Sequence, residues 1–330
     1  MKIMYVDMQW DYGKKERGIN QIGEIGFHQV FKKLGHEVIP FYFDDYIHNP
    51  APLQAKILAT ADEINPDLII FTLYTDQFTP ETLDLLKKKF KTLSWFGDDQ
   101  WRFESYTAKY APHFTYSVTT DHFAVSKYKK LGIQNVIVSQ WASLDLEEAV
   151  DPSFVPEYKY EVSFVGGFNT TRAWIIDEFK KAGINVNVWG RGWPNGGVDF
   201  KDMVRIFQQT KVNLNLSNSV SYDIRCIAHS LRSLLVTLRN RKNASQMKAR
   251  NFEIPCFGGF QLADYVPSLE AYFNIGKDIA CYSTVDEAIM LTRYYLENDV
   301  ERELIRKNSI KRIQDSHTYL HRFEKIFKQI

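Results

Sequence analysis

One stretch of the sequence, KARNFEIPCFGGFQLADY at residues 248–265, combines basic and acidic residues in an order suited to binding a nucleotide. Lys248 and Arg250 stand shortly before Glu253. A glutamate carboxylate accepts hydrogen bonds, so it can hold the two vicinal hydroxyls of a ribose. Arginine and lysine bind phosphate oxygens. These residues therefore predict a site that holds both the sugar and the phosphates of a nucleotide.

A structural interpretation of the same stretch is also open. We expect a helix that ends near residues 252–256, with Arg250 in its last turn and close to Glu253. On a solvated helix these two side chains, three residues apart, would simply pair with each other. Gly258 and Gly259 permit close approach of the backbone to a ligand as the next strand begins. Spacing alone does not separate the two interpretations.

A second candidate for phosphate binding follows the predicted strand at 160–167. Gly166 and Gly167 end this strand before a helix, so backbone amides can approach a phosphate at the helix N-terminus. Arg172 lies in the first turn of that helix and adds a charge-assisted contact. Gly190, in WGRGW, ends another strand. The full GxGxxG fingerprint is absent, so no nicotinamide cofactor is predicted. Plain turns with a surface arginine are the alternative.

The remaining elements place these residues at the ends of strands. Short apolar runs alternate with helical patterns, and the alternation starts again after an acidic, proline-containing segment at 142–157. Such alternation predicts parallel sheets covered on both faces, with ligands beyond the carboxyl ends of the strands. We expect an α/β fold of two Rossmann-like domains, 1–141 and 158–330, facing across a cleft and joined by a linker. The expected strands are 2–7, 36–43, 67–73, 91–97, 114–119, 135–141, 160–167, 184–193, 211–217 and 278–282. The expected helices are 23–35, 52–64, 80–89, 123–132, 170–183, 200–210, 284–297, 299–314 and 317–329.

The composition narrows the class of protein. The chain has 330 residues, 45% of them hydrophobic and 25% charged, as in soluble globular proteins. A net charge of +1 gives no global attraction to nucleic acid or membrane. The cysteines, Cys226, Cys256 and Cys281, fit neither a zinc site nor a disulfide framework and indicate a reducing compartment. Neither a signal peptide nor an apolar run of the ~18 residues needed for a membrane span is seen. We expect a cytoplasmic protein.

The C-terminal half of the sequence resembles a known family. KARNFEIPCFGGFQLADYVPSLEAYFNIGKDIACY and the later YYLENDVERELIRKNSIKRIQDSHTYLHRFEKIF are similar to the spore maturation protein CgeB-like glycosyltransferases. That family is related to the group-one glycosyltransferases, which have the two-domain GT-B fold. The SFVGG element with its following arginine, WGRGW, and SWFGDDQWRF at 94–103 fit as well. The resemblance spans most of residues 67–327.

The resemblance implies roles for the candidate donor residues. In that superfamily a glutamate at this position before the glycine turn binds the ribose of the donor, which corresponds to Glu253. Basic residues contact the diphosphate, and Arg250 and Arg172 match. Many members that retain the anomeric configuration carry another glutamate eight positions earlier, where this chain has Ser245. The retaining mechanism is therefore in doubt.

The resemblance also assigns the acceptor to the first domain. An inverting transfer needs a base that deprotonates the acceptor hydroxyl. Asp98 and Asp99 follow a predicted strand and are the first candidates, although adjacent carboxylates point in different directions. His28 and Asp76 are further candidates. A helix-capping aspartate or a surface histidine is the alternative for each. The polar loop at 8–20 corresponds to loops that line the acceptor cleft.

No metal or cofactor is expected besides the nucleoside-diphosphate sugar, which is a substrate. GT-B enzymes generally stabilise the leaving diphosphate with side chains and helix dipoles. The sequence contains no His, Asp or Cys cluster that indicates otherwise.

A basic segment goes beyond the family pattern. Apolar residues recur at helical spacing over 224–242 and predict a basic amphipathic helix. One interpretation is a helix packed on the core with a solvated basic face. The other is docking to an anionic membrane, at its inner face, or to a polyanionic acceptor. Residues 219–250 contain one acidic residue, Asp223, and the following basic residues: Arg225, Arg232, Arg239, Arg241, Lys242, Lys248 and Arg250.

The sequence thus predicts a metal-independent, hexosyltransferase-like glycosyltransferase. It would move a sugar from a nucleoside-diphosphate sugar to a hydroxyl of a glycan, protein or other acceptor. Two alternatives stay open: a nucleotide-sugar epimerase or hydrolase of GT-B shape, and a non-catalytic protein that binds a nucleotide sugar or glycan. The sequence does not predict the acceptor, the sugar, the nucleobase or the oligomeric state.

Overall fold

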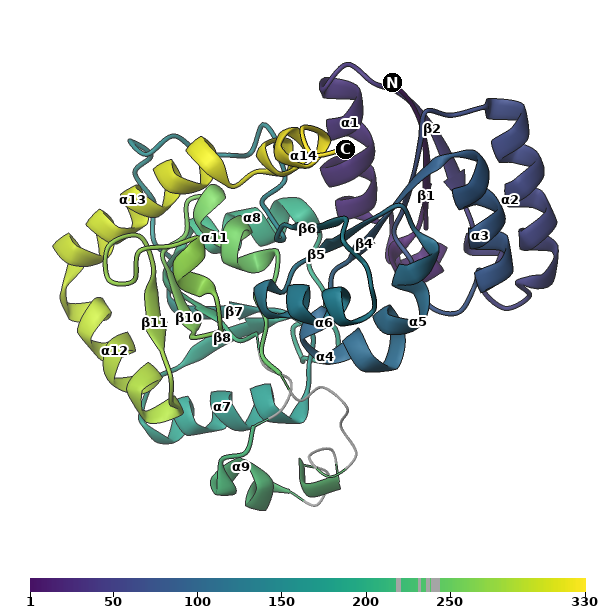
Figure 1. Cartoon of the computed structure of the whole chain (residues 1–330). Coiled ribbons are helices and arrows are strands. Elements are labelled where there is room, and N and C mark those ends of the chain that lie inside the picture. The colour runs from purple at the N-terminus through teal and green to yellow at the C-terminus, as the bar shows by residue number, and fades with distance from the viewer. Residues whose placement is uncertain (218–220, 231–232, 236–237, 239–243) are drawn as a thin grey trace. The chain divides into compact units, whose positions relative to one another are not determined.

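The chain folds into two compact units. The first comprises Met1–Asp145 together with Tyr319–Ile330, and the second comprises Leu146–Thr318. Residues 142–157, the expected linker, form no helix or strand. The computed structural model describes the following residues (Figure 1): 1–217, 221–230, 233–235, 238 and 244–330.

The first unit is built on a sheet of parallel strands in the order β2-β1-β3-β4-β5-β6. All four residues of β3, LIIF, are buried, as expected of a strand covered on both faces. Helix α1 lies on one side of this sheet and helices α2 and α3 on the other (Figure 1). The strands are β1 Lys2–Asp7, β2 Glu37–Tyr42, β3 Leu68–Phe71, β4 Lys91–Phe96, β5 Tyr116–Thr119 and β6 Val136–Val138.

The helices of the first unit follow its strands. A π-helix at Ile22–Gln29 runs into α1, and a second π-helix at Phe103–Thr107 joins α4 to α5. Pro80 is the first residue of α3, and Thr79 caps it by accepting from the backbone N–H of Thr82. The helices are α1 Val30–Lys33, α2 Ala51–Ile64, α3 Pro80–Lys89, α4 Asp99–Arg102, α5 Ala108–Tyr110, α6 Val125–Lys130 and α14 Tyr319–Phe327.

The second unit repeats this design with a sheet in the order β11-β10-β9-β7-β8, again with parallel strands. Helix α7 lies on one side of the sheet and helices α8 and α11 on the other (Figure 1). The expected fold class, with two Rossmann-like sheets, is confirmed. The strands are β7 Tyr160–Val165, β8 Val186–Trp189, β9 Thr210–Asn215, β10 Gln261–Asp264 and β11 Ala280–Tyr282. The helices are α7 Thr170–Lys181, α8 Phe200–Gln208, α9 Ile224–His229, α11 Arg250–Cys256, α12 Val285–Glu297 and α13 Asp299–Ser316.

The last helix, α14, belongs to the first unit, whereas the expected second domain ran to residue 330. The cause is aromatic packing. The ring of Phe323 lies with its centroid 4.7 Å from Phe27, 4.6 Å from Phe31 and 5.8 Å from Trp95. The pairs with Phe27 and Phe31 are edge to face, an arrangement that stabilises beyond the area that the rings bury. The chain therefore returns to the first unit after α13.

The predicted basic helix at 224–242 is wrong as one continuous helix. Helix α9 ends at His229, because Ser230 adopts an extended backbone (φ −159°, ψ 155°). Arg225 is also not free, since it pairs with Asp223 at 2.8 Å and Asp286 at 2.9 Å. Four of the basic residues lie outside the described residues, namely Arg232, Arg239, Arg241 and Lys242.

We predict that Phe323→Ala lowers the free energy of unfolding of the first unit by about 3–5 kcal/mol, since it removes a fully buried ring from the core. Urea denaturation measures this change. Phe123→Ala is the control, because Phe123 is 66% exposed, and should change the value by no more than about 0.5 kcal/mol. Equal effects of the two substitutions would contradict the packing of α14 described above.

Candidate functional site

Two arginine side chains converge on the ring of Phe164, near the carboxyl end of β7 in the second unit. The guanidinium carbon of Arg172 lies 5.3 Å from the ring centroid, and that of Arg250 lies 5.4 Å from it. Both distances are within the range of cation–π attraction. Two like charges are thus held beside one aromatic ring, an arrangement that favours a negatively charged ligand.

Arg172 is fixed by backbone carbonyls. Its Nε and Nη2 donate to Leu216 O at 3.1 and 2.8 Å, and its Nη1 donates to Gly167 O at 2.7 Å. These bonds join the ends of β7 and β9 but leave the positive charge without a carboxylate. Burial, followed by repulsion from Arg250, lowers the pKa of Arg172 to about 10. The side chain therefore stays charged at neutral pH.

Arg250 is held more loosely. Its Nη1 approaches Asn215 Oδ1 at 3.5 Å, the limit of a hydrogen bond. Burial lowers the pKa of Arg250, and the negative charges of Glu253 and Asp264 oppose that shift. Among the described residues, neither this guanidinium nor that of Arg172 has a carboxylate within ion-pair distance. Partly buried cations without such a partner are costly unless a ligand neutralises them.

Glu253 lies in the first turn of α11 and is partly buried. Within the part of the chain that the structure describes, its carboxylate has no hydrogen-bond or ion-pair partner. Burial raises the pKa of Glu253 to about 7, and the positive charge of Arg250 opposes this shift. The carboxylate is therefore available to accept hydrogen bonds from ligand hydroxyls.

The structure corrects the expected position of this helix. Arg250 is the first residue of α11, not part of its last turn. The helix is also not solvated, since Phe252, Ile254 and Cys256 are buried. A surface ion pair between Arg250 and Glu253 is therefore absent from the described residues, and this structural alternative to ligand binding is wrong.

The glycines after β7 and β8 meet at the arginine pair. A Cβ on Gly166 would lie 2.9 Å from Arg250 Nη2. Gly190 has φ +136°, and a Cβ there would lie 2.1 Å from Gly166 O. The structure thus brings Gly166, Gly190, Arg172 and Arg250 together, with Gly167 bonded to Arg172. Helix α7 is capped by Asn169, which accepts from the backbone N–H of Arg172 at 2.8 Å.

Gly258 and Gly259 lie at the opposite end of α11 from Arg250 and contact protein atoms. A Cβ on Gly258 would lie 2.9 Å from Val150 Cγ2, and one on Gly259 would lie 2.8 Å from Asn213 Nδ2. These glycines permit close packing inside the second unit. Lys248 precedes α11, and its backbone N–H donates to Asn251 Oδ1 at 2.9 Å.

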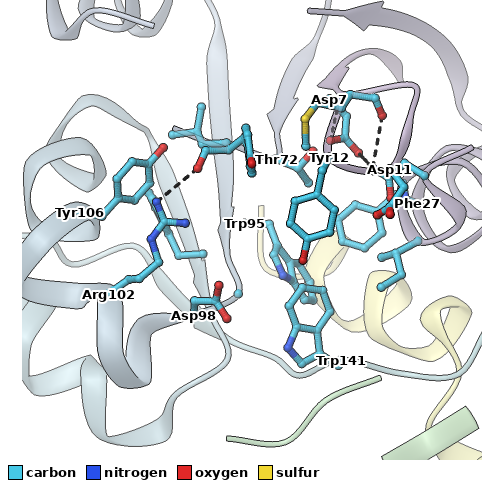
Figure 2. A pocket seen from close by; sticks show the side chains of 18 of the residues that line it. Asp7, Asp11, Tyr12, Phe27, Thr72, Trp95, Asp98, Arg102, Tyr106 and Trp141 are labelled. Carbon is cyan, nitrogen blue, oxygen red and sulfur yellow. Dashed lines mark hydrogen bonds between the residues drawn. The ribbon is translucent and has the colours of Figure 1, made fainter. Parts of the chain in front are cut away.

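The first unit contains a cavity of about 260 Å³ where β1, β3 and β4 end. Figure 2 shows lining side chains. Asp98 lies between β4 and α4, Arg102 is the last residue of α4, and Asp7 and Tyr12 come from the end of β1 and the loop after it. Tyr12 adopts the left-handed region (φ 53°, ψ 33°), which a bulky residue rarely occupies. Residues of the loop at 8–20 thus help to line this cavity.

The other predicted catalytic residues lie outside the cavity lining. Asp99 is fully buried and accepts hydrogen bonds from Thr107 at 2.6 Å, Thr119 at 2.5 Å and Tyr128 at 2.7 Å. Burial raises the pKa of Asp99 to about 6, although these hydrogen bonds oppose the shift. The four bonded groups hold the strands and helices around β4 together.

His28 and Asp76 are also engaged elsewhere. His28 Nδ1 lies 3.1 Å from the Glu24 carboxylate, and the imidazole stacks on the Tyr5 ring with centroids 6.3 Å apart. Asp76 accepts from the Tyr110 hydroxyl at 2.6 Å. Of the four predicted base candidates, Asp98 alone contributes to the cavity lining.

Sequence reasoning missed Asp7, which is the last residue of β1 and lines the cavity. Its Oδ2 accepts from Tyr5 at 2.5 Å and from Asn20 at 3.1 Å, and its Oδ1 accepts from the backbone N–H of Met8 at 2.7 Å. Burial raises the pKa of Asp7 to about 6. A carboxylate at the end of an apolar strand was the available signal, the same signal that singled out Asp98.

Asp264 in the second unit was missed in the same way. It is the last residue of β10, is 6% exposed, and accepts from the backbone N–H of Ser217 at 3.0 Å. Its negative charge acts on both Arg172 and Arg250. The negative charge of Asp264 therefore favours the charged form of both guanidiniums, although it forms an ion pair with neither.

A cluster of three or more His, Cys, Asp or Glu side chains suited to a metal ion does not occur among the described residues. Every helix in the same residues is too short or too polar to cross a bilayer.

The second unit is similar in sequence to a known family. Residues 172–328 match a family model described as glycosyl transferase-like. The match begins at Arg172 and includes Arg250, Glu253 and Asp264, so the arginine pair and its carboxylates lie within the matched region. None of the curated proteins is significantly similar to this chain in sequence.

Solved structures show the same fold. A glycosyltransferase from Rickettsia africae ESF-5 is similar with a TM-score of 0.63 and 10% identity, over 99% of this chain and 97% of that one. Sucrose-phosphate synthase from Thermosynechococcus elongatus has a TM-score of 0.63 at 9% identity, over 100% and 99%. Anabaena HepE in complex with UDP-glucose has a TM-score of 0.61 at 12% identity, over 99% and 98%. The chain thus has the GT-B fold.

We predict that Glu253→Gln stabilises the ligand-free protein at alkaline pH. The carboxyl has its pKa raised from 4.5 to about 7 by folding, so its stabilising contribution is full below pH 4.5 and is lost as pH rises through 7. The free energy of unfolding of Glu253→Gln should exceed that of the native protein by about 1–3 kcal/mol at pH 8 and equal it near pH 4.

Urea denaturation across this pH range measures the difference. Glu297→Gln, a change at an exposed position in the same unit, is the control and should leave the pH profile unchanged. A Glu253→Gln variant that is no more stable than the native protein at pH 8 would contradict the description of a partly buried, unpartnered carboxylate.

Proposed function

We propose that this protein is a glycosyltransferase that moves a hexose from a nucleoside-diphosphate sugar to a hydroxyl acceptor. The observation that carries the proposal is the pair of guanidiniums without carboxylate partners, Arg172 and Arg250, next to the unpartnered carboxylate of Glu253. This combination matches the two parts of a nucleoside diphosphate, which has an anionic diphosphate and a neutral ribose with two hydroxyls.

In this proposal the second unit binds the donor. Arg172 and Arg250 contact the diphosphate, and Glu253 accepts hydrogen bonds from the ribose. Gly166 and Gly190 keep the space beside Arg250 open, since a side chain on either would collide with neighbouring atoms. Anabaena HepE, which has the same fold, was solved with UDP-glucose, and this likeness supports a nucleotide sugar as the donor.

The reaction forms one bond and breaks another. The acceptor oxygen bonds to the anomeric carbon of the sugar, and the bond from that carbon to the terminal phosphate oxygen breaks. The nucleoside diphosphate leaves with the bonding electrons, and the acceptor proton passes to a base. Arg172 and Arg250 would stabilise the negative charge that develops on the leaving phosphate.

We propose Asp98 as the base for an inverting transfer, because this carboxylate lines the cavity of the first unit. Ser245 stands where many retaining relatives carry a glutamate, which favours inversion. The finer assignment to the CgeB-like glycosyltransferases rests on the sequence motifs, as does the prediction that no metal takes part. Lys248 is a further proposed contact of the diphosphate, on its position before α11.

The contact of the segment 224–242 with an anionic membrane or polyanion stays a prediction from the sequence. The segment is not one continuous helix, because α9 ends at His229 and Ser230 is extended. Sedimentation of the full chain with vesicles of phosphatidylserine and phosphatidylcholine would test it.

Thermal denaturation with UDP, GDP, ADP, CMP and dTDP tests the donor site. We expect one nucleotide to stabilise the native protein by about 2.7 kcal/mol at a hundred times its dissociation constant. Arg250→Met and Glu253→Gln should each reduce this shift strongly, whereas Glu297→Gln should leave it intact. The absence of any nucleotide-dependent shift in the native protein would contradict the proposal.

Substitution of the proposed base separates catalysis from donor binding. Asp98→Asn should lower kcat by about 10²–10⁴-fold, since general base catalysis contributes on that order, while the nucleotide shift stays at the native size. Asp62→Asn, on the surface of the same unit, should leave kcat unchanged. Free nucleotide released without an acceptor would instead indicate a hydrolase or epimerase.

A further inference from the structure

The walls of the cavity in the first unit are largely aromatic. Eight of its twenty lining residues are Phe, Tyr or Trp. The rings of Tyr12 and Tyr74 meet edge to face with centroids 5.9 Å apart, and those of Trp95 and Trp141 lie 5.9 Å apart. A volume of about 260 Å³ lies just below the ~300–1,000 Å³ typical of sites for drug-sized molecules. The cavity therefore has room for about one ring with apolar C–H faces.

Two buried donors in this wall lack a partner. The indole N–H groups of Trp95 and Trp141 have no hydrogen-bond acceptor among the described residues. Trp95 is 4% exposed, and an unsatisfied buried donor costs about 1–3 kcal/mol. Both nitrogens are covered by protein atoms, so the two residues contribute the faces of their rings to the wall. Aromatic faces pack well against the apolar C–H groups of a ring-shaped ligand.

The charges of the lining are predominantly negative. Asp7, Asp11 and Asp98 line the cavity, and Arg102 is the cation among the lining residues. The Arg102 guanidinium stacks 4.0 Å from the Tyr106 ring centroid and donates to a backbone carbonyl at 3.2 Å.

The carboxylates of Asp7 and Asp11 differ in how their charge is compensated. Asp11 is bonded to Arg17 at 2.6 Å. Asp7, in contrast, accepts from the neutral groups of Tyr5, Met8 and Asn20. The negative charge of Asp44 acts on it as well. A phosphate or carboxylate on the ligand would therefore be repelled, whereas hydroxyl groups can donate to these oxygens.

We propose that this cavity binds the terminal ring of an acceptor that is an uncharged, hydroxylated sugar or polyol without phosphate or carboxylate. The assignment of this ring as the acceptor rests on the proposed function. Binding of the ring itself follows from the lining of the cavity and does not require the second unit to act on a nucleotide sugar.

Tryptophan fluorescence of the full chain tests this proposal, because two indoles line the cavity. The probes are glucose, galactose, mannose, N-acetylglucosamine and myo-inositol, with glucose 6-phosphate and glucuronate as anionic counterparts. The Arg250→Met variant is titrated beside the native protein, so that anions held by the arginine pair of the second unit are recognised. We expect at least one neutral ring to bind both proteins equally, and the anionic counterparts to bind at least tenfold more weakly to the variant.

Two substitutions locate the binding. Trp141→Ala should weaken binding of the neutral ring at least tenfold. Asp98→Asn should reduce the difference in affinity between neutral and anionic rings. Phe123→Ala, at a surface position, should change neither. The proposal is overturned if no neutral ring binds, if an anionic ring binds the Arg250→Met variant as tightly as its neutral counterpart, or if Trp141→Ala has no effect. If a nucleotide still stabilises the protein against thermal denaturation in any of these cases, the proposed donor site stands. If a neutral ring binds but no nucleotide stabilises the protein, only the proposed transferase function is refuted.

Discussion

Two like charges held beside one ring are the constraint on which the second unit depends. Arg172 is tied to carbonyls at the ends of β7 and β9, and Arg250, the first residue of α11, makes a long hydrogen bond to Asn215. Repulsion between the guanidiniums is compensated only in part by Asp264 and Glu253, which form no ion pair with them. A site of this kind sacrifices stability in the empty protein for affinity toward a polyanion.

The same principle places both candidate sites at the carboxyl ends of parallel strands. In the second unit, Gly166 and Gly190 follow β7 and β8, and Asp264 ends β10. In the first unit, Asp7 ends β1 and Asp98 follows β4. The helices that follow these strands keep the backbone rigid, so side chains just beyond the sheet are positioned for a ligand. The two sites differ in chemistry, since one holds two arginines beside Glu253 and Asp264 and the other is lined by carboxylates and aromatic rings.

Much of this arrangement could be predicted from the sequence. Alternating apolar strands and helical patterns predicted the two parallel sheets, and the family resemblance assigned Arg172, Arg250 and Glu253 to one donor site. The sequence predicted less where the position of a side chain or helix depends on tertiary packing. Asp98 and Asp99 are adjacent in sequence, and only the fold shows that three hydroxyl groups bind Asp99 inside the core. The return of α14 to the first unit likewise depends on aromatic contacts that span nearly 300 residues of sequence.

We propose that the arginine pair binds a diphosphate while Glu253 binds a ribose. Calorimetric titration of the native protein with a nucleoside, its monophosphate and its diphosphate tests this claim most directly. We predict that affinity rises with each phosphate, that Arg250→Met removes most of that rise, and that Glu253→Gln weakens all three ligands by a similar factor. Equal affinities for nucleoside and diphosphate, or a rise that survives in Arg250→Met, would contradict it.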